Sequence, residues 1–133
     1  MTYATHDDMD VRFGETEIGN LGDADRIASA LDDAGAEIDA ALSGLYTLPL
    51  GLGPWPLLRS LECDLARFLL YDNSVPEAVV ERAKAAREVL KGIREGEIAL
   101  VDAGGEALAR TTAARYKGPE PVMTADNLKG FTL

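Results

Sequence analysis

The sequence has few of the residues that most often carry chemistry. It contains one histidine, His6, and one cysteine, Cys63, among 133 residues. A single histidine excludes two-histidine metal motifs and leaves little material for a Ser-His-Asp triad. A single cysteine excludes an intramolecular disulfide and a multi-cysteine zinc site. We expect His6 to be an exposed residue near a helix start, and Cys63 to be a small packing residue inside a helix.

Basic residues and long apolar runs are also scarce. Lysine and arginine together number 13 against 23 acidic residues, which gives a formal net charge of −10. Such a surface repels phosphate backbones, so the composition argues against a basic groove for nucleic acid. No apolar run approaches membrane-spanning length, and the polar start of the chain does not resemble a signal peptide. The sequence therefore predicts a soluble protein made in the cytoplasm, with no membrane contact.

Helical patterning is the main feature that is present. Apolar residues make up 47% of the chain and aromatic residues 6%, so a single domain with an aliphatic core is expected. The apolar residues recur at helical spacing, which predicts an all-α fold. We expect a small four-helix body with one short helix, residues 5–14, and three longer ones, residues 23–44, 56–71 and 74–96. Residues 15–22 are expected to form a polar loop with at most one helical turn.

The pattern changes after residue 97. Residues 98–101 are expected to form a short strand-like segment, and no sustained helical stripe follows them. The chain is therefore divided into a helical body, residues 1–97, and an extended C-terminal arm, residues 98–133. A flexible arm with an apolar end usually docks on another surface. The predicted docking residues are Val122, Met123, Leu128, Phe131 and Leu133.

The third predicted helix has apolar residues on more than one side. Its main stripe runs through Leu58, Leu61 and Leu65, and a second, largely apolar side lies opposite. The loop before this helix is also apolar although it is rich in proline and glycine. This pattern indicates either a buried central helix or a contact between subunits. The predicted subunit-contact residues are Leu50, Leu52, Trp55, Arg59, Cys63, Ala66 and Leu70.

Asp64 is the polar residue of most interest in this helix. It flanks the apolar stripe beside Leu65, so its carboxylate is expected to be partly buried and held by an arginine. Arg67 is the partner on the same helix, and Arg82 and Arg87 of the next helix are the alternatives. We expect an Asp64–Arg67 ion pair, or one of its alternatives, to fix the helix register.

No enzyme signature is found. The acidic pairs lack the spacing of a calcium loop, and the glycine pairs are too short and isolated for a phosphate loop. We therefore expect no enzymatic activity, no catalytic residues, no metal site and no cofactor.

Several segments together resemble one protein family. They are Tyr3-Ala-Thr5, Arg12-Phe-Gly-Glu15, Ala36-Glu-Ile-Asp-Ala40 followed by Gly44, Tyr46 and Leu48-Pro-Leu50, then Cys63-Asp-Leu-Ala-Arg-Phe68, Leu70-Tyr71, Val75-Pro-Glu77 with Arg82, Leu90 to Gly96, and Asn127-Leu-Lys-Gly-Phe131. In this order they resemble the Mu-like phage head–tail joining proteins, a connector or adaptor family.

The resemblance implies a structural role in a tailed phage or phage-like particle. It implies a virion protein of the head–tail neck, assembled as a ring, commonly a dodecamer, beneath the portal protein. The ring would extend the channel through which genomic DNA passes without specific binding, and would contact a neck stopper or tail terminator protein. The long region from Gly104 to Pro121 departs from the family pattern.

The strong negative charge is also compatible with a second class of function. An acidic helical protein can act as a regulator or inhibitor that mimics DNA, provided that its carboxylates are arrayed along one surface. The carboxylates of this sequence are distributed over several predicted helices, which favours the adaptor.

Overall fold

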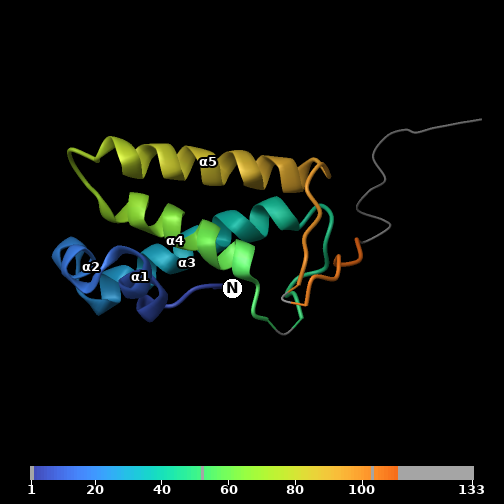
Figure 1. Cartoon of the computed structure of the whole chain (residues 1–133), viewed down its shortest axis with the longest axis horizontal. Helices are drawn as coiled ribbons and strands as arrows, with labels where there is room; N and C mark the ends of the chain where they lie inside the picture. The colour runs from blue at the N-terminus through green and yellow to red at the C-terminus, as the bar shows by residue number, and fades with distance from the viewer. Residues whose placement is uncertain (1, 52, 103, 111–133) are drawn as a thin grey trace, which may run out of the picture.

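The computed structural model describes residues 2–51, 53–102 and 104–110, and these residues form five α-helices. The helices are α1 (His6–Phe13), α2 (Glu15–Leu21), α3 (Ala24–Leu42), α4 (Pro56–Leu70) and α5 (Glu77–Arg94) (Figure 1). The predicted all-α fold is confirmed, but the short polar stretch after α1 is a helix and not a single turn. Gly14, with a φ of 94°, separates α1 from α2, because this backbone conformation cannot continue a helix. The fully buried side chain of Ile18 packs α2 against the rest of the protein.

Local sequence explains where these helices begin. Thr5 and Asp8 form a reciprocal capping box at the start of α1. The Asp23 carboxylate accepts a hydrogen bond of 2.9 Å from the backbone N–H of Arg26 and so caps α3. Pro56 is the first residue of α4, where its missing N–H costs no hydrogen bond.

The three long helices pack against one another and form the core. Figure 1 shows α4 and α5 running together, with α1 and α2 gathered at one end of the molecule. The fully buried side chains at the centre are aliphatic, as the composition predicts. Among them are Ile27, Ile38, Leu42, Leu58, Leu65 and Ile93.

Residues 95–102 and 104–110 return along the loop between α3 and α4, at the end opposite α1 and α2 (Figure 1). Leu100 is fully buried, and its backbone N–H donates to the hydroxyl of Tyr46 at 3.1 Å. In place of the predicted strand-like segment there is a single antiparallel bridge between Val101 and Ala107. The packed body therefore extends beyond the predicted boundary after residue 97, because the segment that follows it includes the fully buried Leu100.

Gly92 makes this return possible. A Cβ atom at this position would lie 2.6 Å from Cδ1 of Ile98, which is far closer than van der Waals contact. The glycine is buried inside α5, where helix propensity alone would favour alanine. Its absent side chain provides the space in which Ile98 packs.

Candidate functional site

Among the residues that the structure describes, the most deeply buried charged one is Glu62 of α4, with 0% of its surface exposed. Its two carboxylate oxygens accept hydrogen bonds of 2.9 Å from the backbone N–H groups of Tyr3 and Ala4. The hydroxyl of Tyr3 also donates a hydrogen bond to Asp39 of α3. The start of the chain is therefore fastened to two long helices through one buried and two partly buried polar contacts.

Burial shifts the pKa of the Glu62 carboxyl group in this contact. Removal from water raises the pKa of Glu62 to about 7, although the two backbone N–H donors oppose the rise by stabilising the carboxylate. Burial also raises the pKa of Tyr3, and its hydrogen bond to Asp39 adds to that effect. The N-terminal segment is thus held by a carboxyl group that titrates near neutral pH.

The sequence analysis missed Glu62. Its neighbours at helical spacing, Leu58, Leu65 and Ala66, are all buried. The sequence could have indicated its burial, because apolar residues flank this glutamate at i−4, i+3 and i+4. The identity of its donors, 58 and 59 residues away, was not visible in the sequence.

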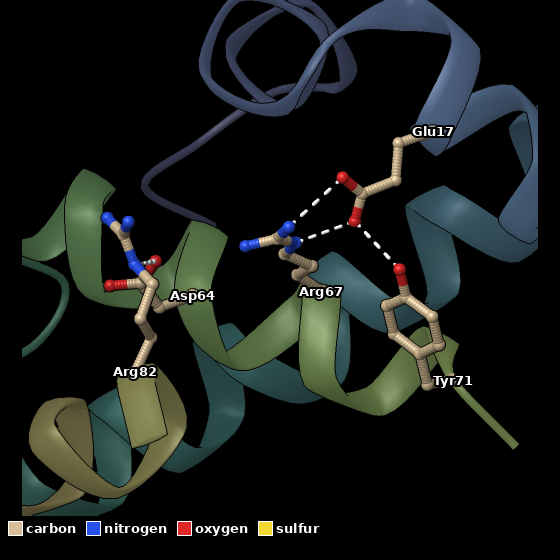
Figure 2. Close-up of polar contacts among 5 residues, drawn as sticks. All are labelled: Glu17, Asp64, Arg67, Tyr71 and Arg82. Atoms are coloured by element: carbon tan, nitrogen blue, oxygen red, sulfur yellow. Dashed lines mark hydrogen bonds and ion pairs between the residues drawn. The ribbon is translucent and has the colours of Figure 1, made fainter. Parts of the chain in front are cut away.

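A second polar cluster joins α2 to α4 (Figure 2). Nε and Nη2 of Arg67 donate to the two oxygens of Glu17 at 2.7 and 3.0 Å. The hydroxyl of Tyr71 donates to the same carboxylate at 2.9 Å. Hydrogen bonding from Arg67 lowers the pKa of Glu17, and the Arg67 guanidinium lies 4.3 Å from the ring centroid of Phe13.

The ion pair predicted between Asp64 and Arg67 is wrong. Asp64 accepts a hydrogen bond of 3.2 Å from Nε of Arg82 on α5, which was one of the alternatives, while Arg67 is taken by Glu17 (Figure 2). Asp64 and Arg67 are three positions apart on α4, but Arg67 turns toward α2, which was not predicted to be a helix. Partial burial raises the pKa of Asp64, and the charge of Arg82 opposes that rise.

The predicted subunit-contact surface is also wrong in its main part. Leu50, Trp55, Cys63, Ala66 and Leu70 are all buried within the protein, at 7% exposure or less. The second apolar side of α4 therefore belongs to a central buried helix, the other interpretation of the pattern. The physical reason is that α4 is packed between α3 and α5 and also contacts α1. Arg59 is half-buried, and Leu52 lies outside the described residues.

The five predicted docking residues also lie outside the described residues. Val122, Met123, Leu128, Phe131 and Leu133 fall in the range 111–133. Their role stays a prediction.

A groove of about 330 Å³ lies between α3 and α5. Its floor is apolar, from Ala40, Ala41 and Leu90, and Arg87, Lys91, Arg94 and Glu37 also line it. Arg87 is bound to Glu37, with Nε 2.7 Å from Oε2. Within the described part of the chain, no ion pair joins Lys91 or Arg94 to a carboxylate. The groove is thus a locally basic surface on a strongly acidic protein.

The two residues whose types most often take part in catalysis, His6 and Cys63, have no catalytic partner placed beside them among the described residues. His6 is half-buried on α1, with Nε2 3.7 Å from Asp10, and Cys63 is fully buried. Burial raises the pKa of the Cys63 thiol to about 12, so it is a neutral packing group at physiological pH. Over residues 2–51, 53–102 and 104–110, no group of three or more potential ligands is placed to hold a metal ion. No helix in that part of the chain is long and apolar enough to span a membrane.

Comparison with known proteins confirms the phage family that the resemblance indicated, while the head–tail joining role stays a prediction. No curated protein matches the chain. The family described as bacteriophage Mu, Gp36 matches residues 3–117, which is most of the chain and includes all five helices. The match also spans both halves of the N-terminal contact, Tyr3 and Ala4 with Glu62. The chain is a member of the bacteriophage Mu Gp36 family, a family of phage proteins.

Proposed function

We propose that this protein is the head–tail adaptor of a tailed phage or phage-like particle. Copies of the helical body form a ring beneath the portal protein, and this ring continues the DNA channel toward a neck stopper or tail terminator protein. The observation that carries the proposal is the match to a phage family over residues 3–117. The fold supports it, because the buried polar groups among the described residues fasten helices and the N-terminal segment together and do not converge on one cavity.

The charge of the protein supports the same role. A net charge of −10 gives a surface that repels the phosphate backbone. DNA can slide past such a lining without sticking, which a channel requires during packaging and ejection. A ring also needs two different surfaces on each copy, since cyclic assemblies use head-to-tail contacts.

The arm is the proposed contact with the portal or with a neighbouring copy. Its apolar residues, Val122 to Leu133, were assigned from the sequence alone. A chain that ends at Gly118 keeps all the described helices but lacks these residues. Neck assembly should therefore be lost in this variant while its helicity, measured by circular dichroism, stays that of the full chain.

The experiment is a complementation assay in a phage whose own copy of this gene is disrupted. Without the protein, DNA-filled or leaking heads should accumulate beside free tails, and the full chain supplied in trans should restore joined particles. The chain ending at Gly118 should fail to restore them. Normal joined particles in the absence of the protein would rule out the adaptor role, and normal joining by the truncated chain would rule out docking through the arm.

The DNA mimic remains the competing function. It requires carboxylates free to replace phosphates along one surface, yet arginines already hold Glu17, Glu37 and Asp64. Displacement of DNA from a DNA-binding host protein by the purified chain would support the mimic and count against the adaptor.

A further inference from the structure

Basic residues are few in this protein, and four of them form a line on one helix. Lys84, Arg87, Lys91 and Arg94 of α5 follow one another at intervals of three, four and three residues. At 100° per residue they lie within about 80° of one another around the helix axis. We call these four residues the basic stripe. All four are exposed, and three of them line the groove between α3 and α5.

Most of this stripe lacks a partner within the described chain. Arg87 is bound to Glu37, but no ion pair joins Lys84, Lys91 or Arg94 to a carboxylate of the described residues. Lys91 and Arg94 are three positions apart and both exposed, so these two cations repel each other, and an acidic surface placed over them would relieve that repulsion.

A matching acidic surface is present on α3. Asp25 and Asp32 are exposed and lie seven residues apart, with the small exposed residues Ala28 and Ala36 beside them. We call Asp25 and Asp32 the acidic stripe. Lys84 and Lys91 are also seven residues apart, as are Arg87 and Arg94. At 1.5 Å per residue, each of these pairs spans about 10.5 Å along its helix. The charges of the two stripes therefore have the same spacing.

The two stripes cannot pair within one copy of the protein. Around α3, Asp25 and Asp32 lie about 120° from the side formed by Glu37, Ala40 and Ala41, which lines the groove next to the basic stripe. The acidic stripe thus faces away from the groove. Two complementary surfaces on different faces of one chain produce a head-to-tail contact that repeats from copy to copy.

We infer that the basic stripe on α5 of one copy docks on the acidic stripe on α3 of the next copy. The inference rests on the proposed function, because it gives the adaptor ring its lateral contact. Exposed ion pairs contribute only about 0.2–1 kcal/mol each. The stripes therefore set the register and the choice of partner, while Ala28 and Ala36 allow the facing helix to approach closely.

Charge reversal in the full chain tests this contact. One variant combines Lys91→Glu with Arg94→Glu, a second combines Asp25→Lys with Asp32→Lys, and a third carries all four changes. Self-association is measured by sedimentation velocity at low ionic strength, after circular dichroism has shown that helicity is retained. Each two-site variant should associate at least about tenfold more weakly than the wild type, because like charges then face each other.

Mixing the variants provides the decisive result. An equimolar mixture of the two two-site variants should associate again, since each carries the surface that the other lacks. The four-site variant should associate with itself, and its net charge equals that of the wild type. The matched control, Glu97→Lys with Glu106→Lys, adds the same charge as the acidic-stripe variant at exposed positions outside α3 and α5 and should associate like the wild type. Association of the wild type should weaken as salt is raised.

Several results would overturn the inference. They are a wild type that stays monomeric at every concentration, two-site variants that associate normally, and a mixture that fails to recover. If the basic-stripe variant loses binding to the portal protein but still self-associates, the basic stripe binds the portal protein and not a second copy, and the inference is wrong. If the wild type occupies the particle neck and the two-site variants join tails normally, the adaptor role stands and this contact fails. If charge rescue is seen but complementation is not, the contact stands and the adaptor role fails.

Discussion

The carboxylate of Glu62 accepts a hydrogen bond of 2.9 Å from the backbone N–H of Ala4, across 58 residues of sequence. Both groups are buried, so neither has water as an alternative partner. This hydrogen bond and the second one, from the backbone N–H of Tyr3, attach the start of the chain to the central helix α4. Position 62 is therefore expected to influence both stability and its dependence on pH.

Replacing Glu62 should destabilise the protein. Glu62→Ala leaves the buried N–H of Ala4 without an acceptor, at about 1–3 kcal/mol, leaves the partly buried N–H of Tyr3 without one at a smaller cost, and opens a cavity. Glu62→Gln keeps the shape and one carbonyl acceptor, as does the protonated carboxyl group that predominates at pH 6, so it should cost less than Glu62→Ala. Urea unfolding at pH 6 measures both variants, and Glu88→Gln at an exposed site is the control. Equal stability of the three variants would contradict the buried contact.

The effect of Glu62 should also depend on pH. Its pKa is about 7 in the folded protein and about 4.3 in an unfolded chain. Between these values the folded state binds more protons than the unfolded state, so this group's contribution to stability falls as pH rises. The loss should approach about 3 kcal/mol between pH 4.5 and pH 8. The stability difference between wild type and Glu62→Gln should shrink across this range, and a difference that grows would contradict the raised pKa.

The bond between Glu17 and Arg67 should stabilise the attachment of α2. Arg67→Ala removes both donors and the contact with Phe13, and should cost about 1–3 kcal/mol because the pair is only partly buried. Tyr71→Phe removes one hydrogen bond and should cost about 1 kcal/mol. Because the pKa of Glu17 is lowered, the pair's contribution is present at neutral pH and lost as pH falls below about 4. Urea unfolding at pH 7 and pH 3 measures this, and an Arg67→Ala effect that is undiminished at pH 3 would contradict the assignment.

These contacts mark the limit of what the sequence could predict. Helical spacing was sufficient to predict α3, α4 and α5, because each buries a long aliphatic stripe. The helix α2 was missed because seven residues with two glutamates and one buried isoleucine give little periodicity. Asp64 was recognised as a half-buried carboxylate, but its partner depends on how α5 packs on α4. The apolar second side of α4 was compatible with two environments, and only the packing of the other helices distinguishes them.

Gly92→Ala should destabilise the protein although alanine is the better helix former. The added methyl group would lie 2.6 Å from Cδ1 of Ile98, and the resulting strain should exceed the propensity gain of about 1 kcal/mol. Adding Ile98→Val removes the clashing atom, so the double variant should recover much of the loss in a double-mutant cycle. Gly19→Ala in α2 is the control, because open space surrounds that position and a stabilisation of about 0.5–1 kcal/mol is expected. Stabilisation by Gly92→Ala would contradict this expectation and show that Ile98 relieves the clash by rotating its terminal methyl group away.

Cys63 should react with thiol reagents only when the protein opens. It is fully buried and its pKa is about 12, so little thiolate is present at pH 8. The labelling rate with a disulfide reagent should therefore follow the population of unfolded protein and rise with urea. Ser29→Cys, at an exposed site on α3, provides a cysteine that should be labelled rapidly in the folded state. Rapid labelling of Cys63 in the native wild type would contradict its burial.

Electron cryomicroscopy of the neck of the purified virion tests the adaptor role most directly. The account predicts a ring of density between the portal protein and the first tail component, into which copies of the five-helix body fit. Neighbouring copies in that ring should place α5 of one against α3 of the next. Virions that lack the protein, or that carry it in the capsid shell or the tail tube, would contradict the account.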